Sequence, residues 1–231
     1  EAAARAIRDA GGDAEAAALD VTDAAAVEAL VARVHGARGR IDYLFNNAGI
    51  NVVVEFRDVT LDDWRRLIDV NLWGVIHGVQ AAYPRMIAQG GGVIVNTASI
   101  AGLVPAAMEG VYGATKHAVV GLSTALRIEA EAFGVQVNAI CPGIVRTPMI
   151  ETGRYVGIPK ERVIPVLAGT AMPLKDAVRE ILEGIEANRE IIVVGDVARD
   201  LHETYRTMPE VSAKKSRKFI TMLRAAREAT E

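Results

Sequence analysis

The sequence predicts an α/β fold built on a parallel β-sheet. Short apolar runs, such as 92–97 and 135–140, have the length and composition of strands buried on both faces. Between such runs lie segments whose apolar residues recur at helical spacing, such as 24–35. Strands that alternate with helices are typical of parallel βαβ units. The 231 residues suit one large domain with a sizeable core.

The first half of the chain contains five expected elements. They are a helix over 1–10, a weak candidate strand over 14–19, a helix over 24–35, a strand over 41–45 and a long helix over 61–88. Thr60 and Asp63 resemble a capping box at the start of the long helix. We expect Pro84 to kink or end this helix, because proline removes a backbone donor and clashes one turn back.

The second half continues the same alternation. Its expected elements are a strand over 92–97, a helix over 112–133, a strand over 135–140, a flexible lid with one or two helical turns over 149–171, a helix over 173–188 and a strand over 190–194. The remaining residues are charged and helix-prone, and Pro209 divides them. Residues 212–231 carry six basic and two acidic side chains, which predicts a solvated helical tail. Contact of this tail with an anionic membrane surface is the alternative.

Composition excludes several classes of protein. The net charge of -3 provides no global basic field, so nucleic acid is not expected as a partner. No run reaches 18 apolar residues, so no membrane span is expected. The single cysteine, Cys141, cannot form an intrachain disulfide, which favours a reducing compartment and predicts a cytoplasmic location. The four histidines show no metal-ligand spacing, and no metal site is expected.

One stretch carries candidate chemistry. Tyr112 and Lys116 are four residues apart, so both leave the same face of a helix. A neighbouring ammonium lowers the pKa of a phenol toward neutrality and makes it a usable general acid or base. Ser99 follows the strand over 92–97 and places a hydroxyl beside the pair. Taken alone, a packed tyrosine and a solvated lysine are the commoner meaning of this spacing.

The order of several motifs along the chain favours a catalytic role for Tyr112 and Lys116 instead. They are Asp20-Val21, Asn46-Asn47-Ala48-Gly49, Asn71, Ser99, Tyr112-x-x-x-Lys116 and Pro142-Gly143. In this order they resemble the short-chain dehydrogenase/reductase family, and the resemblance runs from Glu1 to about Val194. Each motif alone also fits an ordinary turn, loop or helix cap.

The resemblance implies a Rossmann-like doubly wound sheet with the reaction at the carboxyl ends of its strands. It also implies an oxidoreductase that uses NAD or NADP. Tyr112 would exchange a proton with the substrate oxygen, and Lys116 would lower the pKa of Tyr112 and hold the nicotinamide ribose. Ser99 would orient the carbonyl, and Asn71 would interrupt its helix to hold a water linked to Lys116.

The resemblance also assigns cofactor-binding positions. Besides Tyr112 and Lys116, they are Asp20 and Val21 at the adenine, Asn47, Ala48 and Gly49 along the ribose and phosphates, and Pro142, Gly143, Val145 and Thr147 at the nicotinamide carboxamide.

Two departures from the family pattern lead to further expectations. The glycine-rich Thr-Gly-x-x-x-Gly-x-Gly turn is absent from the 231 residues, so we expect roughly 30 to 40 further residues before Glu1 in the natural protein. Without them, residues 14–19 have no strand to pair with and residues 41–45 form an exposed apolar edge. We then expect the chain alone to be poorly soluble and to bind neither NAD nor NADP. A helical extension replaces the short end of the family, which divides the chain into a Rossmann-like domain over 1–195 and an extension over 196–231.

Two hypotheses for function follow. The first is an enzyme that interconverts a secondary alcohol and a ketone on a largely apolar substrate, and the second is a truncated, non-catalytic interaction module of the same fold. The apolar substrate is expected from the loops near Ser99 and after Pro148. Their apolar residues are Val104, Met108, Met149, Ile150 and Ile158. We also expect a homodimer, or a higher homo-oligomer, through the helices over 61–88 and 112–133.

Overall fold

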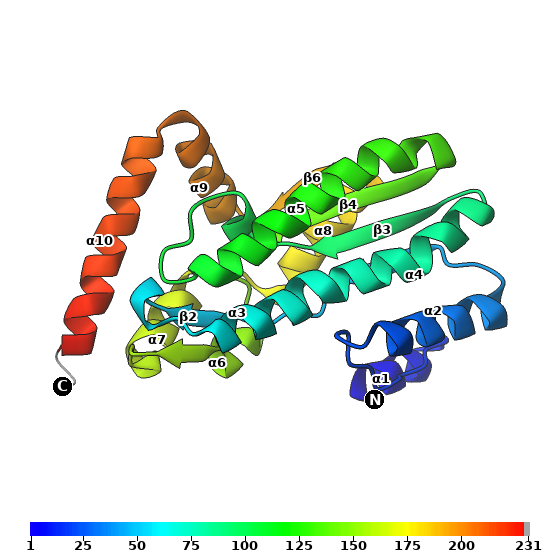
Figure 1. The fold of residues 1–231 in the computed structure, drawn as a ribbon, viewed down its shortest axis with the longest axis horizontal. Coiled ribbons are helices and arrows are strands. Elements are labelled where there is room, and N and C mark those ends of the chain that lie inside the picture. Colours follow the sequence, from blue (N-terminus) through cyan, green and yellow to red (C-terminus); the bar gives the residue numbers. More distant parts are fainter. Residues whose placement is uncertain (229–231) are drawn as a thin grey trace.

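The computed structural model describes residues 1–228 of the chain. Its centre is a parallel four-stranded sheet in the order β1-β3-β4-β6. These strands are β1 (Tyr43–Asn46), β3 (Gly92–Thr97), β4 (Val135–Pro142) and β6 (Ile191–Val194). Figure 1 shows helices running along the sheet, with the C-terminal helix at the opposite end from the N-terminal helices. The α/β fold predicted from the sequence is confirmed.

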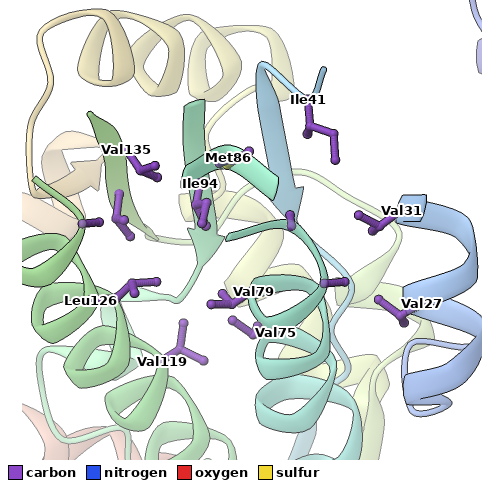
Figure 2. Close-up of a cluster of buried hydrophobic side chains, with 14 of the residues drawn as sticks. Val27, Val31, Ile41, Val75, Val79, Met86, Ile94, Val119, Leu126 and Val135 are labelled. Atoms are coloured by element: carbon purple, nitrogen blue, oxygen red, sulfur yellow. The ribbon is translucent and has the colours of Figure 1, made fainter. Parts of the chain in front are cut away.

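The two faces of the sheet are covered by different helices. On one face, α4 (Gly74–Ala88) and α5 (Gly110–Ala130) pack Val79, Met86 and Leu126 around Ile94 of β3, and α2 (Ala24–Arg38) adds Val27 and Val31 (Figure 2). The next residue of β3, Val95, points to the other face, because side chains alternate along a strand. There it meets Ala177 and Ile185 of α8 (Leu174–Glu186). The central strands are therefore buried on both sides.

The N-terminal region differs from expectation. Helix α1 (Ala2–Asp9) and α2 form as predicted, and the Asp23 side chain caps α2 by accepting a hydrogen bond from the Ala26 N–H. The candidate strand over 14–19 is wrong, because these residues have no strand structure. A strand needs a partner for its backbone groups, and no strand of the described chain lies beside this segment.

Strand β1 lies at one edge of the sheet, as was expected for residues 41–45. It pairs only with β3, within the part of the chain that the structure describes. The Tyr43 and Phe45 rings stack 6.3 Å apart and are 58% and 47% exposed. The edge is thus apolar and open, as predicted.

The long helix expected over 61–88 is interrupted early. Thr60 and Asp63 form the predicted capping box of α3 (Leu61–Ile68). A π-helical turn over Asp69–Trp73 then separates α3 from α4. Pro84 lies inside α4, which continues to Ala88, so the helix does not end at this proline; the alternative that Pro84 kinks the helix stays a prediction.

The segment expected as a flexible lid is more ordered than its sequence indicated. It contains α6 (Met149–Thr152), β5 (Arg154–Val156) and α7 (Lys160–Thr170). Strand β5 pairs in parallel with β2 (Val52–Val54), about a hundred residues earlier in the chain. Local sequence patterns carry no information about so distant a partner, and both short strands were missed.

Two helices follow β6, namely α9 (Asp196–Thr207) and α10 (Pro209–Glu228). Helix α10 lies at the same end of the molecule as the small β2–β5 sheet (Figure 1), and its Ile220 packs beside the cluster of Val53, Met108, Ile158 and Val163. Arg224 of α10 also forms an ion pair with Glu55. The tail was expected to be a solvated helix, and Ile220 and Arg224 instead contact the rest of the protein. Within residues 1–228, no helix is long and apolar enough to cross a membrane.

Candidate functional site

The candidate site lies where β1, β3 and β4 end. Ser99 follows β3, and its hydroxyl oxygen accepts a hydrogen bond of 3.1 Å from the Ala101 N–H at the start of the short helix Ile100–Gly102. This bond fixes the Ser99 side chain while leaving its O–H free to donate. Helix α5 begins at Gly110 and carries Tyr112 and Lys116 in its first two turns, so all three side chains reach the same end of the sheet.

Tyr112 is the centre of this group. It is 8% exposed, and the Ser99 side chain lies close enough to lower the pKa of its phenol. The Lys116 Nζ lies 5.6 Å from the centroid of the Tyr112 ring and donates a hydrogen bond of 2.7 Å to the Thr97 carbonyl. The structure thus brings Ser99, Tyr112 and Lys116 together.

Asn71 lies in the π-helical turn and is fully buried. Its Oδ1 accepts a hydrogen bond of 2.8 Å from the Ile50 N–H, and its Nδ2 donates to the Ile50 carbonyl at 2.9 Å and to the Thr115 hydroxyl at 3.3 Å. The side chain therefore holds the segment after β1 against α5. The interruption of the helix at Asn71 was expected; the water that the resemblance assigns to this residue stays a prediction.

Burial dominates the acid–base properties of the site. It raises the pKa of Tyr112 above its ordinary value, the Ser99 side chain lowers it, and the nearby Glu109 and Cys141 raise it. Burial also lowers the pKa of Lys116 to about 8. Burial gives the largest contribution to the Tyr112 pKa shift and Lys116 is not among its causes, so the expected lowering of the Tyr112 pKa by Lys116 stays a prediction.

Cys141 is a neighbour that the sequence did not assign to the site. It is a fully buried free thiol in β4. Burial raises its pKa to about 12, while a backbone hydrogen bond with Ser99 and the charge of Lys116 lower it. The thiol is therefore protonated and packs as a small apolar side chain.

The residues after β1 fit a bound nucleotide. Asn47 and Ala48 are exposed at the carboxyl end of the strand, and the Asn47 Oδ1 accepts a hydrogen bond of 3.0 Å from the Thr97 hydroxyl. A Cβ placed on Gly49 would lie 3.3 Å from the Asn71 Oδ1 and 3.6 Å from the Lys116 Nζ. The missing side chain at Gly49 thus keeps space open beside Lys116.

The other predicted cofactor positions lie in two places. Pro142 ends β4, and the Gly143 N–H donates a hydrogen bond of 3.0 Å to the Val194 carbonyl at the end of β6. Val145 and Thr147 continue this loop and are partly buried.

Asp20 and Val21 lie at the other place, before α2. The Asp20 carboxylate accepts hydrogen bonds from the N–H and hydroxyl of Thr22, and Val21 packs against Gly74 at the start of α4.

A cavity of about 260 Å³ opens beside Gly49. Its lining mixes apolar, polar and charged residues, namely Gly49, Ile50, Asn51, Val52, Asp63, Arg66, Met149, Thr152, Gly153 and Arg154. Of the five apolar residues expected to contact substrate, only Met149 is among them. Val104, Met108 and Ile158 are buried inside the protein instead, and Met108 and Ile158 pack with Val53 of the small sheet.

Sequence reasoning missed several residues of the site. The Thr115 hydroxyl accepts a hydrogen bond from Asn71, and the Thr97 carbonyl accepts one from Lys116. Asn51, which lines the cavity, donates a hydrogen bond to Glu109. Glu109 precedes Tyr112 by one helical turn, and this spacing could have predicted that the two side chains lie close together.

Comparison with known proteins decides the family. The family model described as short chain dehydrogenase matches residues 1–154. The chain belongs to the short chain dehydrogenase family. Members of this family are NAD(P)-dependent oxidoreductases with a Rossmann-type fold.

Named relatives agree with this membership. This short chain dehydrogenase is 34% identical over 194 residues to a D-beta-hydroxybutyrate dehydrogenase of Rhizobium meliloti (strain 1021), covering 82% of this chain and 74% of the relative. Among the curated relatives compared, the chain spans between 50% and 74% of the relative's own length.

Solved structures show the same relationship. A short chain dehydrogenase/reductase from Burkholderia phymatum in complex with NAD matches with a TM-score of 0.76 and 29% identity, over 88% of this chain and 80% of that one. A gluconate 5-dehydrogenase from Burkholderia cenocepacia J2315 in complex with NADP and tartrate matches with a TM-score of 0.61 and 36% identity, over 64% of this chain and 58% of that one.

Proposed function

We propose that this short chain dehydrogenase interconverts a secondary alcohol and a ketone, with Tyr112 as the group that exchanges a proton with the substrate oxygen. The observation that carries the proposal is that Ser99 and the Lys116 ammonium both lie beside Tyr112 at the carboxyl end of the sheet. Burying a phenol and an ammonium beside one another is costly, and such groups with perturbed pKa values cluster at functional sites.

The protein's residues have separate tasks in the reduction of a ketone. Tyr112 is protonated at neutral pH because burial raises its pKa, so its O–H can donate the proton to the carbonyl oxygen. The Ser99 O–H donates a hydrogen bond to the same oxygen and orients it. Asn71 fixes the backbone of Ile50, and with it Gly49, beside Lys116. When bound, the nicotinamide exchanges a hydride with the substrate carbon.

We propose that NAD or NADP binds across the carboxyl ends of the strands of the sheet. Lys116 would hold the nicotinamide ribose, and the resemblance supports roles for the segments before α2, after β1 and after β4. The assigned residues are Asp20, Val21, Asn47, Ala48, Gly49, Pro142, Gly143, Val145 and Thr147.

The substrate would occupy the cavity beside Gly49. Ile50, Val52 and Met149 offer apolar contact for its carbon skeleton, which supports a largely apolar substrate body. We further propose that the protein acts in the cytoplasm as a homo-oligomer, and the unpaired, buried Cys141 is consistent with a reducing compartment.

The direct experiment measures nicotinamide reduction or oxidation with a panel of secondary alcohols and ketones, using NAD and NADP in turn. We expect turnover with at least one apolar substrate and one of the two nucleotides. Absence of turnover across the panel, in protein that binds nucleotide, would contradict the proposal.

A further inference from the structure

The two sides of α10 have different surroundings. Ser212, Ser216 and Ile220 are spaced four residues apart, so they lie along one side of the helix. Ser212 is 4% exposed, Ser216 and Ile220 are partly buried, and Ile220 packs on the rest of the protein. The next position in the series, Arg224, pairs with Glu55. This side of α10 therefore faces the protein.

The opposite side of α10 is basic. It carries Lys214, Lys215 and Lys218, with Arg217 at its border, and all four side chains are exposed. Val211 precedes the three lysines by three, four and seven residues, so it shares their side of the helix, where it is 41% exposed. Within residues 1–228, no carboxylate forms an ion pair with any of the four basic side chains. Their charges therefore have no direct counterpart in the described part of the protein.

The charge of α10 is opposite to that of the rest of the chain. Residues 209–228 contain six basic and two acidic side chains, a net charge of +4. The whole chain carries -3, so the remaining residues together carry -7. Figure 1 shows α10 at the opposite end of the molecule from α1 and α2. The positive charge is thus concentrated at one end, where it can orient the protein toward an anionic partner.

We propose that the basic side of α10 docks the protein onto an anionic lipid membrane. A cluster of roughly four to eight basic side chains on a helix is attracted to anionic lipid headgroups. Met208, directly before α10, is 51% exposed, and with Val211 it supplies apolar side chains that enter the boundary between headgroups and acyl chains. Docking through this surface does not depend on the proposed reaction.

The composition of the basic side favours a membrane over a protein or a nucleic acid as the partner. Lysine is depleted in interfaces between proteins, whereas charge attraction to a membrane needs no shaped partner surface. A nucleic acid that extends beyond one helix would meet the acidic remainder of the chain, which repels it. A membrane that contacts only the α10 end keeps most of that remainder farther away than a Debye length, which is about 8 Å at physiological salt.

Cosedimentation with lipid vesicles tests the proposal. We expect the protein to bind phosphatidylcholine vesicles that contain phosphatidylglycerol, to leave them at high salt and not to bind vesicles of phosphatidylcholine alone. A variant with Lys214→Gln, Lys215→Gln, Arg217→Gln and Lys218→Gln should bind the anionic vesicles roughly 100-fold or more weakly, because each basic residue near the surface increases the affinity about 5-fold. Glutamine removes the charge and keeps a high helix propensity, so α10 should stay helical.

A matched control removes the same charge elsewhere. The changes Arg5→Gln, Arg65→Gln, Lys175→Gln and Arg189→Gln remove four exposed basic side chains outside α10, and this variant should bind vesicles like the unmodified protein. Melting temperatures of both variants show whether they are folded. No binding to the anionic vesicles, equal binding to both kinds of vesicle, or equal weakening in the two variants would overturn the proposal. Tighter binding to duplex DNA than to vesicles at equal phosphate concentration would do the same, because the partner would then be a nucleic acid.

Discussion

The Lys116 ammonium lies 5.6 Å from the centre of the Tyr112 ring while it donates a hydrogen bond of 2.7 Å to the Thr97 carbonyl. The backbone at the end of β3 thus holds the cation beside the phenol. Because α5 supplies both side chains and β3 supplies the carbonyl, this arrangement depends on the packing of the helix against the sheet.

Tyr112→Phe should remove most turnover and leave the fold intact. Phenylalanine keeps the buried ring but has no proton to transfer, and loss of a general acid typically costs ~10²-fold or more in kcat. Steady-state kinetics and the melting temperature measure the two effects separately. Tyr43→Phe, at an exposed ring on β1, is the matched control and should retain full activity. Near-normal turnover in the Tyr112 variant would reject the role of this residue.

Asn71→Ala should destabilise the protein. The change leaves the partly buried Ile50 N–H and carbonyl without their partners, which should lower the free energy of unfolding by roughly 2 to 4 kcal/mol. Urea unfolding measures this difference. Asn47→Ala removes an exposed asparagine after β1 and should cost less than about 1 kcal/mol. Similar stability in the two variants would show that Asn71 does not anchor this segment.

Lys116 should make stability depend on pH. The pKa of Lys116 is about 8 in the folded protein, against an ordinary value of 10.5. Between these values the unfolded chain keeps a proton that the folded protein has released. The unfolded state therefore binds more protons, and the free energy of unfolding should rise with pH across this window.

The full contribution is on the order of 3 kcal/mol, reached as the pH approaches 10.5. Lys116→Met has no ammonium to titrate and should lack this rise. Unfolding of both proteins at several pH values across the window provides the measurement, and the difference between them removes the effect of other titrating groups. Parallel pH curves for the two proteins would be evidence against a depressed Lys116 pKa.

Association through α5 should produce a homodimer. Ile128 of this helix is 74% exposed. Trp73, directly before α4, and Phe133, shortly after α5, are each 48% exposed. We expect a mass of twice the 24.6 kDa chain by light scattering at micromolar concentration. Ile128→Glu should shift the mass toward one chain, whereas Leu174→Glu at an exposed site on α8 should not. A single-chain mass for the unmodified protein would rule out the dimer.

Much of the central sheet could be predicted from the sequence because its signals are local. Residues 92–97 form β3 with the predicted bounds, since a short apolar run between turns is sufficient to specify a buried strand. The capping box of Thr60 and Asp63 likewise involves residues three apart. The spacing of Tyr112 and Lys116 on one helix face is local as well, and the structure brings both beside Ser99.

Only the tertiary structure decided those features that depend on residues far apart in the sequence. Residues 14–19 are not a strand because no strand lies beside them, and Val52–Val54 became one because Arg154–Val156 pairs with it. The direction of the Tyr112 pKa shift also came from the fold, since the extent of burial is a property of the surrounding elements rather than of the spacing to Lys116. Asn51 and Glu109 are 58 residues apart, and only the packing of the chain places them side by side. Local residue patterns thus determined most helices, the central strands and the candidate catalytic group, whereas long-range contacts determined whether the remaining short strands formed and which groups surround Tyr112.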